Sequence, residues 1–178
     1  MSYCLICINI IRHLLYRFRY GKRYHSAWIE RIHPGCRIRL FKNGSIKIGH
    51  NCEIESGCDI QVHGNGKLSI GDGTYMNRYC MVSAQNSVKI GSHCMFGPAV
   101  KIFDNDHEYS ASEGVKSSLK TAPISIGNNC WLASNVVILR GTSIGDNCVI
   151  GAGCIVSGNV PKNTIMKVSQ HSILVQMS

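Results

Sequence analysis

The sequence predicts an all-β protein folded as a parallel β-helix of about five coils, and three observations carry this prediction. Large apolar residues recur every six positions from Ile48 to Val156, and six is not a helical period. Glycine is abundant, with 18 residues, whereas aromatic residues make up only 7% of the chain. The pattern Ile-Gly-x-Asn at 48–51, 126–129 and 144–147 supplies Gly and Asn where tight turns need positive φ. Three hexads close one triangular coil, and a coil buries its interior only by stacking on the next.

The residues that open the hexads are large and predicted to point inward. They are Ile48, Ile54, Ile60, Ile70, Met76, Val82, Ile90, Phe96, Ile102, Ile126, Leu132, Ile138, Ile144, Ile150 and Val156. The array is therefore the expected core of the domain.

Residues 1–20 precede the array and are expected to form a helix, because Leu5, Ile8, Ile11, Leu15 and Phe18 fall on one face. The apolar run is shorter than the roughly 20 residues that cross a bilayer, and no small-residue cleavage site marks a signal peptide. We expect this segment to pack on its own domain or on a neighbouring subunit. The alternative is a basic amphipathic helix in peripheral contact with an anionic membrane surface.

The positive charge is concentrated in the same N-terminal region. Of the net charge of +9, residues 1–42 contribute nine Lys or Arg against a single acid, Glu30. The rest of the chain is nearly neutral and adds no base-reading or stacking residues to a basic face. This distribution argues against a nucleic-acid partner.

Most cysteines occupy one fixed position of the six-residue repeat. Seven of the ten lie four residues after a hexad-opening residue: Cys52, Cys58, Cys80, Cys94, Cys130, Cys148 and Cys154. Val and Thr occupy the same slot elsewhere, as at Thr74 and Val100. The pattern predicts small core side chains rather than disulfides or zinc ligands. Unpaired thiols in this number indicate a reducing compartment, so the cytoplasm is expected, at the inner face of the membrane if the helix binds lipid.

Extra residues break the period at three places. They lie near Gly66–Ser69, at Val88–Lys89 and across Glu108–Ser125, each after a third hexad, so one corner of the prism is expected to carry all three. The last lacks large aliphatic residues at the hexad positions, which predicts a loop, and long loops in compact domains are usually functional.

The expected organisation has three parts: a helical and basic segment (1–45), the β-helix domain with its loop at 108–125 (46–161), and a C-terminal cap (162–178). Solenoids need such caps to cover their open ends. Ile173, Leu174 and Val175 are the expected buried residues of the cap.

The chain contains the run PISIGNNCWLASNVVILRGTSIGDNCVIGAGCIVSGNVP (Pro123–Pro161). Above all through this run, and also through the repeats and the loop at 108–125 with its flanks, the sequence resembles the hexapeptide-repeat acyltransferases. Within them it is most similar to the maltose/galactoside O-acetyltransferases and the O-acetyltransferases of surface-polysaccharide synthesis. The resemblance covers Ile46 to Lys162. It implies a left-handed β-helix, a homotrimer, acetyl-CoA as co-substrate without a metal, and a cleft between adjacent subunits where acetyl-CoA meets the acceptor.

The resemblance also implies the catalytic residues. The family's histidine lies 24 residues before the tryptophan that follows IGNN, and here these two are His107 and Trp131. A neutral imidazole can take the proton of a sugar hydroxyl as it attacks the thioester carbonyl. By the same match, the backbone N–H of Ser134 donates to the oxyanion. Trp131 would form a wall against which cofactor and acceptor pack.

Further residues are implied for the two substrates. Asn77 and Asp106 are candidates for acceptor contacts. Those for coenzyme A are the small residues Ala133, Gly151 and Ala152 along the pantetheine arm, and the cations Arg140, Lys162 and Lys167 at the phosphates. The chain departs from the family after Pro161 and lacks the N-terminal pattern of the maltose/galactoside enzymes, which favours a polysaccharide-pathway sugar over a free disaccharide.

Three alternatives remain open from the sequence. One is acyl transfer to another acceptor, such as an amino sugar or an antibiotic. Another is a zinc hydratase on the same scaffold, which needs three converging histidines such as His63, His93 and His107. The last is a purely structural β-helix, although an unbroken array would suit that role better.

Overall fold

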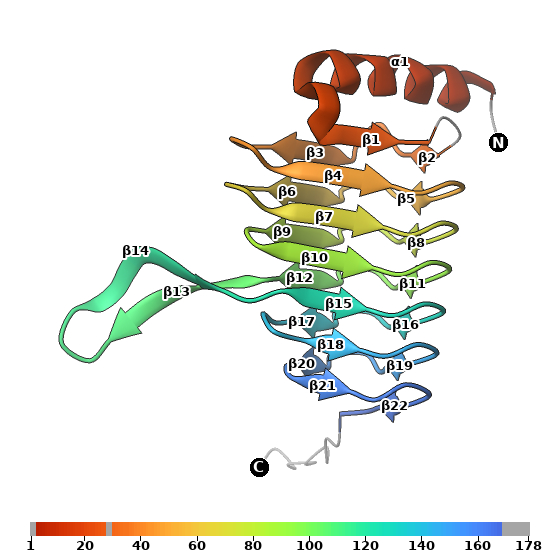
Figure 1. Ribbon diagram of the computed structural model, residues 1–178. Coiled ribbons are helices and arrows are strands. Elements are labelled where there is room, and N and C mark those ends of the chain that lie inside the picture. Colours follow the sequence, from red (N-terminus) through yellow and green to blue (C-terminus); the bar gives the residue numbers. More distant parts are fainter. Residues whose placement is uncertain (1–2, 28–29, 169–178) are drawn as a thin grey trace, which may run out of the picture.

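The computed structural model describes residues 3–27 and 30–168, which form a three-sided parallel β-helix with one helix lying across its first end (Figure 1). Face A consists of β1 (Tyr24–Ser26), β4 (Ser45–Ile48), β7 (Lys67–Ile70), β10 (Ser87–Ile90), β15 (Ile124–Ile126), β18 (Ser143–Ile144) and β21 (Asn159–Val160). Face B consists of β2 (Arg31–Ile32), β5 (Glu53–Ile54), β8 (Tyr75–Met76), β11 (Met95–Phe96), β16 (Trp131–Leu132), β19 (Val149–Ile150) and β22 (Ile165–Met166). Face C consists of β3 (Arg37–Leu40), β6 (Asp59–Val62), β9 (Met81–Ala84), β12 (Lys101–Phe103), β17 (Val137–Ile138) and β20 (Ile155–Val156).

The hexad residues stack in register along the inside of the prism. Leu132 pairs with Ile150 on face B, and Ile126 pairs with Ile144 on face A, in parallel ladders. Every hexad-opening residue is buried. Large apolar side chains of successive coils therefore stack on one another, and the predicted parallel β-helix is confirmed.

The solenoid begins one coil earlier than the hexads indicate. Strands β1, β2 and β3 form a complete first coil inside the segment expected to be only helical and basic, so there are six complete coils instead of about five. The sequence hides this coil because two of its inward positions are polar. Ser26 stands in register with Ile48, and the buried Glu30 precedes Ile32 as Cys52 precedes Ile54.

The cysteine slot lies against the next coil. The Cys94 thiol donates to the Gly127 carbonyl over 3.1 Å, and the Thr74 hydroxyl donates to the Gly91 carbonyl over 2.9 Å. Both side chains are small and both carry a donor, which explains why Cys and Thr alternate in this position. All nine cysteines whose side chains the structure describes are free, as the pattern predicts.

The Ile-Gly-x-Asn turns use their two small residues differently. Asn129 and Asn147 adopt the left-handed backbone conformation, with φ of 55° and 58°. Gly127 has no positive φ; instead, a Cβ there would lie 2.6 Å from the backbone nitrogen of Asp146 in the next coil. Asparagine thus makes the turn, and glycine lets adjacent coils approach.

Helix α1 (Tyr3–Tyr20) and the short helix η1 (Gly21–Arg23) cover the first coil. The fully buried contacts of α1 are polar, while Tyr16 and Tyr20 are partly buried and pack against the core. His13 Nδ1 lies 2.7 Å from the Tyr24 hydroxyl, and His13 Nε2 lies 3.1 Å from Glu30 Oε2. The Ser26 hydroxyl donates to the same Glu30 oxygen over 2.7 Å. Tyr24 and Glu30 of the first coil therefore find a partner on the helix in His13, while Ser26 bonds to Glu30 within the coil.

The helix packs on its own domain, as expected, but not through its aliphatic face. Ile8, Ile11, Leu15 and Phe18 are exposed, while Asn9 and His13 are buried. The side chain of Leu5 is outside the described part of the chain. No helix in residues 3–27 or 30–168 is both long and apolar enough to cross a bilayer.

The segment 108–125, expected to be a loop, lies instead mostly in a β-hairpin. Strands β13 (Asn105–Ser110) and β14 (Gly114–Thr121) pair antiparallel and project from the prism (Figure 1). None of their side chains is fully buried, so no apolar alternation marks them as strands. As expected, the hairpin leaves at the edge between faces C and A, whereas the two smaller insertions only lengthen strands beside that edge.

The expected C-terminal cap is described only in part. Residues 162–168 include β22, which completes face B, while Ile173, Leu174 and Val175 lie outside the described residues. The cap therefore stays a prediction.

The burial of the thiols predicts their reactivity. Burial raises the pKa of Cys36 to about 12 and that of Cys52 to about 11, and the reactive species is the thiolate. All eight buried cysteines are at most 2% exposed, so we expect them to be unreactive toward Ellman's reagent in the native protein and reactive in guanidinium. The side chain of Cys4 lies outside the described part of the chain, so Cys4→Ser is used as the background; there the exposed Cys7 serves as the internal control, since Cys7→Ser should remove rapid labelling. Rapid native labelling of the Cys7→Ser variant at any of the eight would contradict the buried ladder.

Candidate active site

The root of the hairpin is fixed to the prism by a buried carboxylate. Asp104 is fully buried, and its two oxygens accept hydrogen bonds from the backbone N–H groups of Gln85 and Asn86, each over 2.8 Å. The Asn105 side chain donates to the Ser83 carbonyl over 3.2 Å. These contacts tie β13 to the preceding coil, so the hairpin starts from a rigid base.

His107 lies on β13, with its imidazole exposed to solvent. Its Nδ1 is 3.0 Å from the carbonyl oxygen of Lys116 on β14. Because a carbonyl only accepts, Nδ1 carries the proton in this contact and Nε2 keeps its lone pair. Nε2 has no partner among the residues that the structure describes. The hairpin thus presents an imidazole in the tautomer that a general base requires.

An ion pair ties the outgoing strand to the following coil. Arg140 Nε lies 2.6 Å from Asp106 Oδ2, one residue before His107. Arg140 follows β17 at the same edge as the hairpin. Its predicted contact with coenzyme A phosphates and the predicted contact of Asp106 with the acceptor stay predictions. Together, Asp106, His107 and Arg140 form the hairpin patch.

Most of the other candidate residues lie at or beside a different edge of the prism, between faces B and C. Backbone hydrogen bonds connect this edge from coil to coil: Asn77 N–H donates to Phe96, Gly97 to Leu132, Ala133 to Ile150 and Gly151 to Met166. Asn77, Ala133, Ser134, Gly151 and Ala152 therefore stack on one edge, and Lys167 follows at its lower end. We call Asn77, Trp131, Ala133, Ser134, Gly151 and Ala152 the corner patch.

Two features of the corner patch suit the predicted chemistry. In the described part of the chain, nothing accepts a hydrogen bond from the backbone N–H of Ser134. Gly97 of the preceding coil lies against it, where a Cβ would be 2.7 Å from the Ser134 nitrogen. Trp131 is 52% exposed on face B, in register with Met95 and Val149. The edge thus offers an available donor beside an exposed aromatic ring.

The hairpin patch and the corner patch do not meet within one chain. The hairpin leaves one side of the prism, whereas β16, which carries Trp131, lies on the other (Figure 1). Lys162 is on a third edge, between faces A and B, beside Asp146. Within one chain, the candidate base and the candidate oxyanion donor therefore lie on different edges of the prism.

The histidines of the hydratase alternative do not converge within the chain either. His63 stacks on Phe41 at the edge between faces C and A, with 4.4 Å between ring centroids, and His93 lies at the edge between faces A and B. Burial lowers the pKa of His63, and the nearby Arg39 charge lowers it further. With His107 on the hairpin, the described histidines form no zinc site in a single chain.

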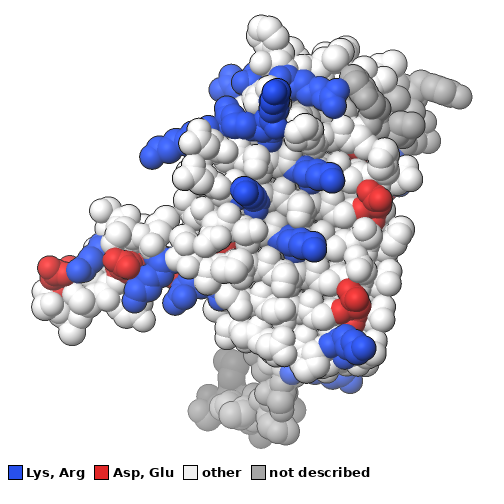
Figure 2. All heavy atoms as spheres, in the orientation of Figure 1, with Lys and Arg blue, Asp and Glu red and all other residues white. Residues whose placement is uncertain are grey.

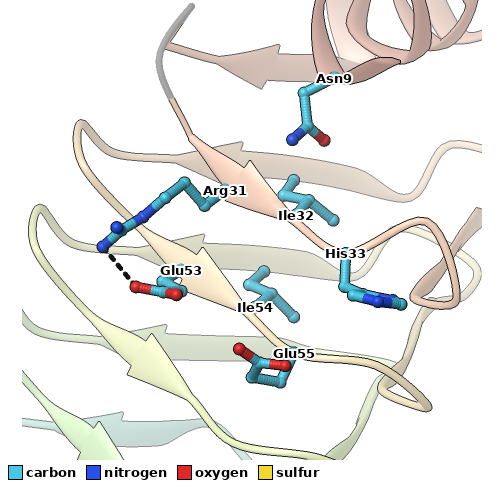
Figure 3. A pocket seen from close by; sticks show the side chains of 7 residues that line it. All are labelled: Asn9, Arg31, Ile32, His33, Glu53, Ile54 and Glu55. Atoms are coloured by element: carbon cyan, nitrogen blue, oxygen red, sulfur yellow. Dashed lines mark ion pairs between the residues drawn. The ribbon is translucent and has the colours of Figure 1, made fainter. Parts of the chain in front are cut away.

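A hollow at the helix-capped end is remote from these patches. It is lined by Asn9, Arg31, Ile32, His33, Glu53, Ile54 and Glu55 (Figure 3). Its floor is apolar, and the Arg31 charge is neutralised by an ion pair with Glu53. The hollow lies coils away from His107, so we do not assign the chemistry to it.

Comparison with known proteins adds an independent observation. Residues 123–158 match the bacterial transferase hexapeptide (six repeats) family. A galactoside O-acetyltransferase of Escherichia coli K12 is 31% identical over 152 residues, covering 85% of this chain and 70% of the relative. The chain belongs to the hexapeptide-repeat O-acetyltransferases.

A second relative and a solved structure agree with this assignment. A relative in the same organism, named for O-acetyl transfer in lipopolysaccharide biosynthesis, is 31% identical over 149 residues, covering 76% of each chain. A hexapeptide-repeat acetyltransferase of Vibrio cholerae, crystallised with acetyl-CoA, has the same fold, with a TM-score of 0.53 and 23% identity over 87% of this chain and 70% of that chain. The parallel β-helix of this chain agrees with the left-handed β-helix that the resemblance implies.

Family membership favours the enzymatic interpretation over a structural or hydratase role. The hexad pattern and the Pro123–Pro161 run were sufficient to predict it. Sequence reasoning missed the Lys116 carbonyl that selects the imidazole tautomer and the Asp106–Arg140 ion pair. Neither carries a sequence signal, because both depend on how the hairpin strands pair and emerge.

The ion pair predicts a kinetic effect without a large stability effect. Both side chains are partly exposed, so their pairing is worth about 0–1 kcal/mol of folding free energy. We expect Asp106→Asn and Arg140→Gln each to lower kcat about tenfold by loosening the hairpin, with little change in Tm. The double variant should resemble either single one.

The same variants separate two roles for Arg140. If Arg140 instead binds coenzyme A phosphates, Arg140→Gln will raise KM for acetyl-CoA while Asp106→Asn will not. Steady-state kinetics with varied acetyl-CoA makes this distinction.

Proposed function

We propose that this O-acetyltransferase moves the acetyl group of acetyl-CoA to a hydroxyl of a sugar in a cell-surface polysaccharide or its precursor. The observation that carries the proposal is the exposed imidazole of His107, with Nδ1 held 3.0 Å from a backbone carbonyl and Nε2 left able to accept a proton. The names of the two Escherichia coli relatives support a sugar acceptor. The acetyl-CoA complex of the Vibrio cholerae protein supports the co-substrate.

The reaction needs one proton transfer and one stabilised oxyanion. His107 Nε2 takes the hydroxyl proton while the sugar oxygen attacks the thioester carbonyl, and this assistance contributes roughly 10²–10⁴-fold. The Ser134 N–H donates to the oxyanion of the tetrahedral intermediate. When the carbon–sulfur bond breaks, the imidazolium returns its proton to the departing thiolate. The Lys116 carbonyl holds the Nδ1 proton throughout and stabilises the transient positive charge.

The separation of the two patches supports a site built by two chains. A hairpin that projects from one prism reaches beyond its own surface, whereas the corner patch needs a base from outside its own chain. Closed symmetric assemblies repeat such a contact around an axis. We therefore propose a homotrimer in which the hairpin patch of each chain faces the corner patch of the next, with coenzyme A lying along Ala133, Gly151 and Ala152.

The base is tested by His107→Ala and by His107→Asn. Both should lower the rate of thiol release from acetyl-CoA with a sugar acceptor by about 10²–10⁴-fold, with unchanged Tm. The acceptor panel should include galactosides, amino sugars and polysaccharide fragments, since it also decides between sugar hydroxyls and other acceptors. Full activity of both variants would remove His107 from the mechanism.

A mixing experiment tests the shared site. His107→Ala and Trp131→Ala chains, each inactive alone, are refolded together so that hybrid assemblies form. If the site spans two chains, about one quarter of the sites in the hybrids regain both residues. Activity should then return to about one quarter of the wild-type value. If each site belongs to one chain, no mixture recovers activity.

The oxyanion donor is tested through Gly97 with a matched glycine. Gly97→Ala would place a Cβ 2.7 Å from the Ser134 nitrogen, while Gly91→Ala would place one 2.4 Å from the Gly127 carbonyl oxygen, away from the corner patch. Both should lower Tm, but only Gly97→Ala should lower kcat, by about 10²-fold. Equal kcat in the two variants would argue against Ser134 as the donor.

A further inference from the structure

Helix α1 turns its aliphatic side away from the prism. Phe18 is 93% exposed, Leu15 62% and Ile11 58%. With Ile8, these residues follow the spacing of one helical face, and Ile10 and Leu14 widen it. We call these six side chains the outer stripe. Apolar helix faces are normally buried, so the outer stripe requires an explanation.

The orientation of the helix is fixed by its polar contacts. Arg12 donates to the carbonyl oxygens of His33, Pro34 and Cys36 over 2.7–2.8 Å. His13 lies between Tyr24 and Glu30 in a buried network. Rolling the outer stripe inward would break these contacts and leave Glu30 buried without a partner on the helix. The outer stripe is therefore held outward by the fold.

Cations lie beside the C-terminal half of the outer stripe and beyond its end. Arg17, Arg19, Lys22 and Lys42 are exposed at the helix-capped end, where Figure 2 shows Lys and Arg side chains gathered. The single acid of residues 1–42, Glu30, is buried beside His13 and therefore contributes no exposed negative charge to this surface. The surface thus combines exposed apolar side chains with a cluster of positive charge.

We propose that α1 is an interfacial anchor that lays the outer stripe on an anionic lipid surface. Exposed apolar residues flanked by Lys and Arg are the features by which amphipathic helices bind such surfaces. The apolar side chains enter the boundary between headgroups and acyl chains, and each cation near the surface strengthens binding about fivefold. A second copy of the chain fits less well, because two strongly basic ends would face one another.

The test is co-sedimentation of the full chain with vesicles of phosphatidylcholine, with or without phosphatidylglycerol. Wild type should bind the anionic vesicles, less at high salt, and bind the neutral ones weakly. Leu15→Ser/Phe18→Ser should weaken binding at least tenfold, and Arg19→Gln/Lys22→Gln should weaken it by roughly 25-fold at low salt. Val115→Ser, which removes another side chain that is 74% exposed, is the matched control and should bind as wild type does.

Three outcomes would contradict the proposal that α1 binds lipid. The proposal fails if wild type ignores anionic vesicles, or if Leu15→Ser/Phe18→Ser binds as well as Val115→Ser. It also fails if the apolar variant changes the mass of the particle in light scattering instead of its lipid binding, since the outer stripe would then contact another copy. Thiol release with a soluble acceptor should be unchanged in the Leu15→Ser/Phe18→Ser variant, so the result is separate from the proposed acetyl transfer.

Discussion

Every part of this molecule depends on one constraint: a coil of the β-helix covers its interior only with the coils above and below it. The large inward side chains stack in register, and the thiol and hydroxyl groups of the small slot reach the carbonyls of the next coil. Because each coil is incomplete alone, the stack is cooperative along its axis. It is also stiff, which suits a scaffold that must hold a donor such as the Ser134 N–H in position.

The same constraint makes the ends of the stack special. The first coil has Ser26 and Glu30 where the next coil has Ile48 and Cys52, and these polar side chains would be costly inside the prism without partners. Helix α1 supplies a partner for Glu30 through His13, Ser26 bonds to the same Glu30 carboxylate, and Arg12 satisfies carbonyls of the first coil. A polar interface therefore closes the stack, and the aliphatic residues of the helix are left for the opposite side. The amphipathic pattern of α1 is thus inverted relative to that of an ordinary surface helix.

Sequence patterns predicted the parts of the structure that repeat and not those that occur once. The hexads and the Ile-Gly-x-Asn turns recur, so their side chains report the same environment many times. Strands β13 and β14 escaped notice because neither of their faces is buried, and the first coil escaped because Ser26 and Glu30 do not resemble Ile48 and Cys52. Among the candidate site residues, His107 and Ser134 came from family resemblance. Their placement on separate edges follows from the order of the three faces, which no single motif encodes.

The position of the hairpin along the stack links the proposed site to the proposed anchor. The hairpin leaves after the fourth coil, three coils from the one that α1 covers. Neighbouring strands are about 4.8 Å apart, which puts the hairpin root about 14 Å from the first coil along the axis. With α1 on a lipid surface, His107 would stand off the headgroups instead of touching them. Such a geometry would reach a hydroxyl on an extended, lipid-attached glycan more readily than one on the first sugar beside the membrane.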